Sequence, residues 1–204
     1  MTRAAPAVHV VDDDADFRTA LARMLCASGF EVLSYSSGGD FLARGTHGCG
    51  CVVADLRMPQ IDGLALQQAC TRAGLTMPFV FLTGDADVPS AVSALKHGAV
   101  DFLDKRAPRE ALLGAIRAAL ERDLQARSMR SRQEQLHRRF AALSEREHEV
   151  LAQVVQGRMN KQIAADLAIH ERTVKLHRTS ITGKLGVRSV AELTTLVRES
   201  QLPG

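Results

Sequence analysis

Carboxylate, hydroxyl and ammonium side chains follow four of the short apolar runs in the first half of this 204-residue sequence. They are Asp12, Asp13, Asp55, Thr83 and Lys105. Carboxylates are hard oxygen ligands that suit Mg²⁺, and a carboxylate can also attack phosphorus as a nucleophile. A hydroxyl and an ammonium group beside them can bind the oxygens of a transferred phosphoryl group. These residue types together predict Mg²⁺-dependent phosphoryl transfer to a carboxylate.

Each of these residues has an expected role. Asp12, Asp13 and Asp55 are the candidate Mg²⁺ ligands, and Asp55, alone at the tip of its strand, is the candidate phosphoacceptor. Lys105 and Thr83 are the candidate partners of the phosphoryl oxygens. One polar residue at a strand end needs no function. Four such positions, each after a different expected strand, are hard to explain without a shared site.

The elements that must position these residues alternate between apolar strands and amphipathic helices. Strand patterns cover 8–11, 31–35, 51–54, 78–82 and 100–103, and helix patterns occupy the stretches between them and continue from 108. This alternation predicts an α/β fold, a doubly wound five-stranded parallel sheet with helices on both faces. Ligands of such sheets bind outside the carboxyl ends of the strands, where these polar residues fall.

A long helix is expected to leave this first domain and act as a linker. Apolar residues recur at helical spacing after residue 109, at Leu113, Ile116, Leu120 and Leu124. Residues 122–142 carry a net charge of +4, and Arg127 and Ser131 interrupt any heptad seam. A partly solvated helix is therefore at least as well supported as a coiled coil.

Residues 143–204 show only helical patterns. Ser144 and Glu147 have the spacing of a capping box, and Asn160 is expected to cap the next helix. A short turn then precedes a longer helix over 171–185. A helix-turn-helix has this arrangement, and its second helix fits the major groove of DNA. The helical pattern alone fits a small bundle with a solvated basic face equally well.

Residues 6–122 resemble a response-regulator receiver domain, with a CheY-like and flavodoxin-like fold. The segments that carry the resemblance are Val10-Val11-Asp12-Asp13-Asp14, Val53-Ala54-Asp55-Leu56-Arg57-Met58-Pro59, Phe81-Leu82-Thr83-Gly84 and Asp101-Phe102-Leu103-Asp104-Lys105. The resemblance implies that a sensor histidine kinase phosphorylates Asp55. It also implies Mg²⁺ ligation by Asp13, Asp55 and the Arg57 carbonyl, with Asp12 acting through water, and a coupled switch pair of Thr83 and Phe102.

The last part of the chain resembles the LuxR-type DNA-binding domain. The segments that carry this resemblance are 143–151, 160–164, 173–177 and 181–189. Carried over by position, the candidate base-reading residues are Lys175, Leu176 and Thr179. The candidate contacts to the DNA backbone are Thr173, His177, Arg178 and Arg188. Thr179 stands where relatives have a basic residue, so the base that is read at this position is left open.

The whole chain is similar to the NarL/FixJ family of transcription regulators. The resemblance implies a receiver at 1–122, a helical linker at 123–142 and a DNA-binding domain at 143–204. It implies that phosphorylation favours a homodimer, through the face around 88–103, that binds double-stranded promoter DNA. RNA polymerase is a further expected partner. The only phosphoryl transfer expected is to the protein's own Asp55, so the protein is not expected to be a turnover enzyme.

Two features depart from the receiver pattern. Arg106 follows Lys105 where the family usually has proline, often with a cis bond. Because a cis bond before another residue costs about 2.5–4 kcal/mol, this bond is expected to be trans and Lys105 less firmly placed. Asp85, two residues after Thr83, could pair with Arg57 and change the lifetime of the phosphoryl group.

Two alternatives remain, the first motivated by the missing proline after Lys105 and the second by the carboxylates themselves. One is DNA binding without control by phosphate. The other is a hydrolase similar to the haloacid dehalogenases, with the helical bundle as an oligomerisation module. Such enzymes place a second Asp two residues after the nucleophile, where this sequence has Arg57.

Composition narrows the remaining classes. No apolar run is long enough to span a bilayer and the first residues lack an apolar signal segment, so a cytoplasmic protein without membrane association is expected. The four cysteines have no metal-binding spacing and are expected to be reduced thiols.

Overall fold

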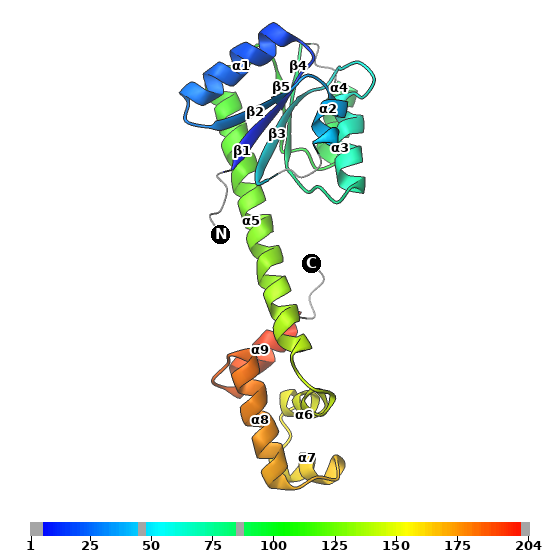
Figure 1. The fold of residues 1–204 in the computed structure, drawn as a ribbon, viewed down its shortest axis with the longest axis vertical. Helices are drawn as coiled ribbons and strands as arrows, with labels where there is room; N and C mark the ends of the chain where they lie inside the picture. Colours follow the sequence, from blue (N-terminus) through cyan, green and yellow to red (C-terminus); the bar gives the residue numbers. More distant parts are fainter. Residues whose placement is uncertain (1–5, 45–47, 85–87, 201–204) are drawn as a thin grey trace. The chain divides into compact units, whose positions relative to one another are not determined.

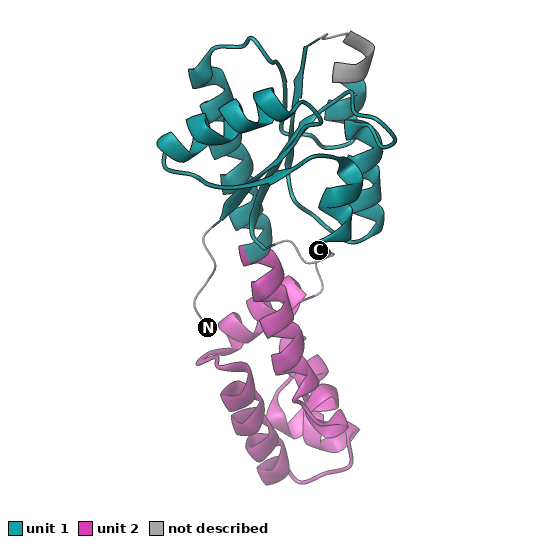
Figure 2. Ribbon diagram, turned by 45° about the horizontal axis from the view of Figure 1, so that its top comes forward, with its two compact units in different colours: residues 1–127 teal, residues 128–204 magenta. Residues whose placement is uncertain are grey.

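The structure, a computed structural model, describes residues 6–44, 48–84 and 88–200. The chain divides into two compact units, Met1–Arg127 and Ser128–Gly204, which Figure 2 shows in teal and magenta. The boundary lies within a single helix, α5 (Arg109–Ala141), as the helical pattern after residue 109 predicted. Each unit is described separately below.

The first unit contains the predicted five-stranded parallel sheet, with strand order β2-β1-β3-β4-β5. The three inner strands are buried along their whole length, whereas the two edge strands are partly exposed. This is the pattern expected of a parallel sheet covered on both faces. The strands are β1 (Ala7–Val11), β2 (Glu31–Tyr35), β3 (Gly50–Asp55), β4 (Phe79–Thr83) and β5 (Asp101–Asp104).

Helices cover both faces of this sheet (Figure 1). The helices α1 (Ala15–Ala27) and α5 lie on one face, and α2 (Gly38–Ala43), α3 (Gly63–Arg72) and α4 (Val88–Lys96) lie on the other. Each face has its own hydrophobic core. Successive residues of β3 alternate between the two cores, because successive side chains of a strand point to opposite faces of the sheet.

The start of β3 is tied to α5 by a buried carboxylate. Asp123 accepts a hydrogen bond from the Gly50 N–H at 2.9 Å and pairs with Nε of Arg127 at 2.7 Å. Arg127 also donates to the Gly48 carbonyl at 2.7 Å. Gly50 has φ of 145°, and a Cβ there would lie 1.8 Å from the Ala7 carbonyl oxygen. Only glycine fits this position, and its N–H finds its partner on a helix distant in sequence.

The second unit adds four helices to the end of α5: α6 (Glu145–Val155), α7 (Asn160–Asp166), α8 (Glu171–Leu185) and α9 (Val190–Ser200). Ile163, Val174, Ile181 and Leu185 recur at helical spacing and are buried together in the core of this unit. The capping box of Ser144 and Glu147 is confirmed. Among the described residues, no helix is both long and apolar enough to cross a membrane.

The predicted cap of α7 is wrong. Met159, not Asn160, is the N-cap residue. The backbone N–H of Met159 donates a hydrogen bond to Oε1 of Gln162 at 2.9 Å. The Asn160 oxygen instead accepts a hydrogen bond from Arg178 at 2.9 Å. Asn160 therefore connects the two helices of the helix-turn-helix.

Candidate functional site

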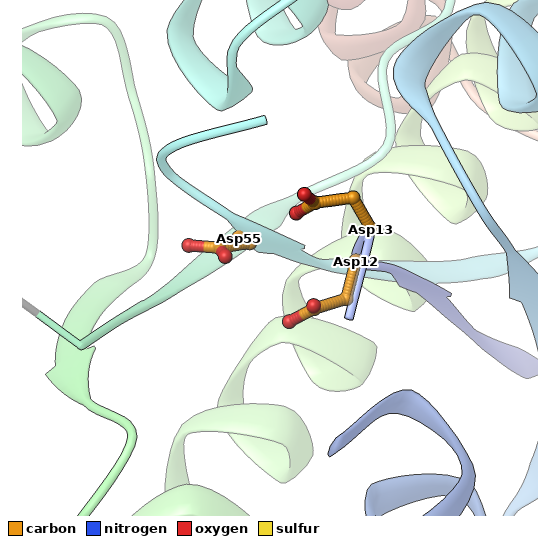
Figure 3. Close-up of side chains that lie close together, drawn as sticks. All are labelled: Asp12, Asp13 and Asp55. Carbon is orange, nitrogen blue, oxygen red and sulfur yellow. The ribbon is translucent and has the colours of Figure 1, made fainter. Parts of the chain in front are cut away.

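Three carboxylates meet at the carboxyl ends of β1 and β3. Asp12 and Asp13 follow β1, and Asp55 is the last residue of the neighbouring strand β3 (Figure 3). One oxygen from each carboxylate lies within 4.8 Å of the others. The rule that ligands bind at the carboxyl ends of parallel strands, called the strand-end rule below, therefore correctly predicted which acids would come together. A donor set of carboxylate oxygens alone fits the preference of Mg²⁺ for hard ligands.

Asp55 is held at the tip of the central strand. Its Oδ1 accepts the Arg57 N–H at 3.2 Å, and its Oδ2 accepts a hydrogen bond from Lys105 Nζ at 2.7 Å. Gly63, at the start of α3, lies against the backbone of Asp55. A Cβ at this glycine would come within 2.5 Å of the Asp55 carbonyl oxygen. The position after the Asp62 cap must therefore lack a side chain so that α3 can pack beside Asp55.

Of the two consecutive acids after β1, Asp12 is buried, with 2% of its surface exposed, whereas Asp13 is exposed. The Oδ1 of Asp12 accepts the Asp14 N–H at 2.9 Å, and its Oδ2 lies 2.8 Å from Lys105 Nζ. Burial raises the pKa of Asp12, although the bonds from Lys105 oppose this shift. Asp13 thus faces solvent, while Asp12 supports the site from within.

Lys105 bridges the two acidic positions. Its N–H donates to the Thr83 carbonyl at 2.8 Å, which fixes the end of β5 against β4. Burial lowers the pKa of Lys105, but its bonds to Asp12 and Asp55 outweigh this and raise the pKa above its ordinary value. The ammonium therefore stays charged between the carboxylates.

The loop after Lys105 is closed without proline. No cis peptide bond occurs in the described part of the chain, so the expected trans bond to Arg106 is confirmed. Asp104 accepts the Arg106 N–H at 2.7 Å and pairs with its guanidinium at 3.0 Å. Lys105 still reaches Asp55, which contradicts the expectation of a poorly placed lysine.

The predicted switch residues lie on neighbouring strands. Thr83 is buried at the end of β4, and Phe102 of β5 is partly buried against the core beneath α4. Their strands pair in parallel, with Thr83 opposite Asp104. Arg57 is exposed beside Asp55. Asp85, its expected partner, lies outside the described residues.

The helix α8 presents the predicted DNA-contacting side chains. Lys175, Leu176 and Thr179 are exposed, and the side chain of Leu176 is 64% exposed. Thr173, His177 and Arg178 are partly buried. Arg188 is exposed just beyond the helix. A protruding leucine among polar residues suits contact with a thymine methyl group.

Several supporting residues were not found from the sequence. The ring of Phe17 lies under the Lys105 ammonium, and Arg18 donates to the Asp12 carbonyl at 2.6 Å. No sequence signal connects Phe17 with a lysine 88 positions away in the chain. In the second unit, Glu147 accepts bonds from Ser180 at 2.6 Å and Lys184 at 2.7 Å.

Comparisons with known proteins cover nearly the whole chain. The family model described as "Response regulator receiver domain" matches residues 8–117, and "Bacterial regulatory proteins, luxR family" matches residues 141–197. Response regulator protein TodT of Pseudomonas putida is 41% identical over 194 residues, which are 95% of this chain and 86% of TodT. Transcriptional regulatory protein FixJ of Azorhizobium caulinodans is 40% identical over 190 residues, 93% and 90% of the two chains.

A solved structure of response regulator StyR is similar over 96% of this chain and 100% of its own, with 43% identity and a TM-score of 0.90. These matches are to regulators and not to turnover enzymes, so the hydrolase alternative is wrong. This chain belongs to the NarL/FixJ family of two-component response regulators, transcription regulators that join a receiver to a LuxR-type DNA-binding domain.

Proposed function

We propose that a sensor histidine kinase phosphorylates Asp55 and that this controls DNA binding by α8. The observation that carries the proposal is the position of Lys105, whose ammonium bridges Asp12 and Asp55 at the carboxyl edge of the sheet. A carboxylate at a strand tip, beside a fixed positive charge and two further carboxylates, has the groups that phosphoryl transfer requires.

In the proposed transfer, an oxygen of Asp55 attacks phosphorus and the phosphorus–nitrogen bond of the kinase phosphohistidine breaks. The imidazole nitrogen keeps the electron pair. Lys105 moves from the Asp55 carboxylate to a phosphoryl oxygen, and the Thr83 hydroxyl donates to another. Asp12, Asp13, Asp55 and the Arg57 carbonyl would hold Mg²⁺, which when bound neutralises negative charge on the phosphoryl group.

We propose that phosphorylation acts on DNA binding by changing one surface of the receiver domain. The side chains of Thr83 and Phe102 change conformation together and alter the face around α4 and β5. The receiver thus has two conformational states, and phosphorylation favours one of them. Val92 and Leu95 of α4 are exposed apolar residues that support a homodimer through this face. Two copies of α8 then bind two half-sites of double-stranded DNA.

The contacts of α8 follow from its exposed residues. Lys175, Leu176 and Thr179 are proposed to read base edges in the major groove. The proposed contacts to phosphates are made by Thr173, His177, Arg178 and Arg188. Within this scheme residues 1–122 are the receiver, 123–142 the linker and 143–204 the DNA-binding domain. RNA polymerase is a further proposed partner, and the cytoplasm the proposed location.

The test compares wild type with Asp55→Asn after treatment with phosphoramidate and Mg²⁺. Phosphate-affinity gels should show retarded wild type and unretarded Asp55→Asn, and Asp16→Asn, a nearby exposed carboxylate, should behave as wild type. Binding is then measured on a duplex selected from a random-sequence pool by the phosphorylated protein. Equal DNA affinity of treated wild type and Asp55→Asn would reject control by phosphate and favour constitutive binding.

A further inference from the structure

The surroundings of the Lys105 ammonium suggest a role for a residue outside the proposed phosphorylation machinery. An ammonium has three N–H groups. Two of them face the carboxylates of Asp55 and Asp12, at 2.7 and 2.8 Å. The third partner is aromatic, because Nζ lies 4.4 Å from the centre of the Phe17 ring. The side chain of Lys105 is only 17% exposed, so protein groups supply most of its surroundings.

The three partners differ in what else they must do. Asp55 must free its oxygen to attack phosphorus, and Asp12 is one of the expected Mg²⁺ ligands. The ring of Phe17 has neither task. It carries no formal charge and no oxygen, yet the negative face of an aromatic ring attracts a cation. Phe17 is therefore a partner that Lys105 can keep while both carboxylates are engaged elsewhere.

The chain places this ring firmly. Phe17 is in the first turn of α1, and its N–H donates to the capping carboxylate of Asp14 at 3.0 Å. Asp14 directly follows the acidic pair, so the ring and the carboxylates are parts of one short segment. The ring also packs against the core between the sheet and α1 and α5. It lines a pocket with Met24, Lys105 and Arg109.

We infer that Phe17 is a positioning residue that holds the Lys105 ammonium at the site through its ring face while Asp55 accepts the phosphoryl group. The inference rests on the proposed function of Asp55. The Phe17 ring then remains in contact with Lys105 after the lysine has lost its bond to Asp55. This contact matters in a loop where Arg106 replaces the usual proline.

The test separates the charge attraction of the ring from its packing. Phenylalanines with one, two and three ring fluorines are introduced at position 17, because fluorine weakens the negative ring face and hardly changes its shape. Phosphorylation by saturating phosphoramidate with Mg²⁺ is followed by rapid quench. The rate should fall stepwise with each fluorine. Phe17→Leu should be about 2- to 30-fold slower than wild type, the range that cation–π strengths imply.

Two natural substitutions serve as controls. Phe17→Tyr keeps the aromatic face and should retain a rate near that of wild type. Phe30→Leu removes a partly buried ring from the same core without touching Lys105, and should leave the rate unchanged. A flat rate across the fluorinated series, or equal slowing in Phe30→Leu and Phe17→Leu, would overturn the inference.

A second measurement does not require phosphorylation. In the resting wild type, the ring current of Phe17 should shift the ε-methylene protons of Lys105 upfield in NMR spectra, and Phe17→Leu should abolish this shift. If wild type takes up no phosphate, the proposed function of Asp55 has failed. An unshifted Lys105 signal in wild type overturns the inference about Phe17 whether or not phosphate is taken up.

Discussion

The N–H of Gly50 donates to the carboxylate of Asp123 at 2.9 Å, across 73 residues of sequence. This bond joins the start of the central strand β3 to α5, and Asp123 is 2% exposed. A buried N–H without an acceptor carries the full cost of its desolvation. The contact therefore contributes to the stability of the first unit as well as to the attachment of the helix.

Replacing this carboxylate should destabilise the first unit. We expect Asp123→Ala to lower its free energy of unfolding by about 1–3 kcal/mol, because Gly50 and Arg127 both lose a partner. Tyr35 is the only tyrosine and the chain has no tryptophan, so tyrosine emission during urea unfolding reports on this unit alone. Glu121→Ala, at an exposed position of the same helix, should change stability by less than about 0.5 kcal/mol. Equal losses would show that the buried bond contributes nothing.

A methyl group at Gly63 should strain the proposed phosphorylation site. The added Cβ would lie 2.5 Å from the Asp55 carbonyl oxygen and 2.9 Å from the Phe81 ring. We expect Gly63→Ala to cost about 1–3 kcal/mol of stability through overpacking and to slow phosphorylation of Asp55. Gly114→Ala, with nothing within 4 Å, should instead stabilise α5 by about 0.5–1 kcal/mol. The same urea titration measures both, and wild-type stability in Gly63→Ala would contradict this account.

The second unit should lose stability in acid through Glu147. Hydrogen bonds from Lys184, Ser180 and Ser144 lower the pKa of Glu147 from 4.5 to about 2. Because the folded pKa lies below the unfolded one, the contribution is fully present above pH 4.5 and is lost as the pH falls toward 2.

Hydrogen exchange across α6 to α9 can follow this unit in the whole chain. At about pH 6 the second unit of Glu147→Gln should be less stable than that of wild type. This difference in stability should shrink in acid. Glu145→Gln, an exposed change on the same helix, should show no such trend. A difference that does not vary with pH would mean that the charge of Glu147 is unimportant.

Sequence specificity should depend on Leu176. We expect Leu176→Ala to reduce discrimination at one base pair by about 1–3 kcal/mol, measured against single-base variants of the selected duplex. Met159→Ala removes a similarly exposed apolar residue, 65% exposed, that precedes α7. It should leave the preference intact. Uniform weakening on every duplex would indicate that Leu176 does not read a base.

The strand-end rule explains how much of the site was predictable. Asp12, Asp55 and Lys105 each follow an apolar run, and a parallel sheet brings such positions to one edge whatever the details of packing. The order and layers of the sheet follow from the same alternation of strands and helices. These are consequences of periodicity, which the sequence carries directly.

Pairings that depend on tertiary packing were not predictable. Lys184 of α8 pairs with the buried Glu147 of α6, a contact that no local sequence pattern indicates. Asn160 has a good capping side chain, but Arg178 of the next helix binds it and Met159 takes the cap position. In each case the partner lies on another helix, and local patterns hold no information about that pairing.

The contacts of Asp123 and Arg127 also bear on how this protein could be recombined with others. A gene fusion that joins a foreign output domain after residue 127 would keep the bonds from Asp123 to Gly50 and from Arg127 to Gly48. A fusion joined at residue 122 would leave the Gly50 N–H buried without its acceptor. Transplanted receivers of this kind should therefore fold well or poorly according to whether the junction includes one further turn of helix.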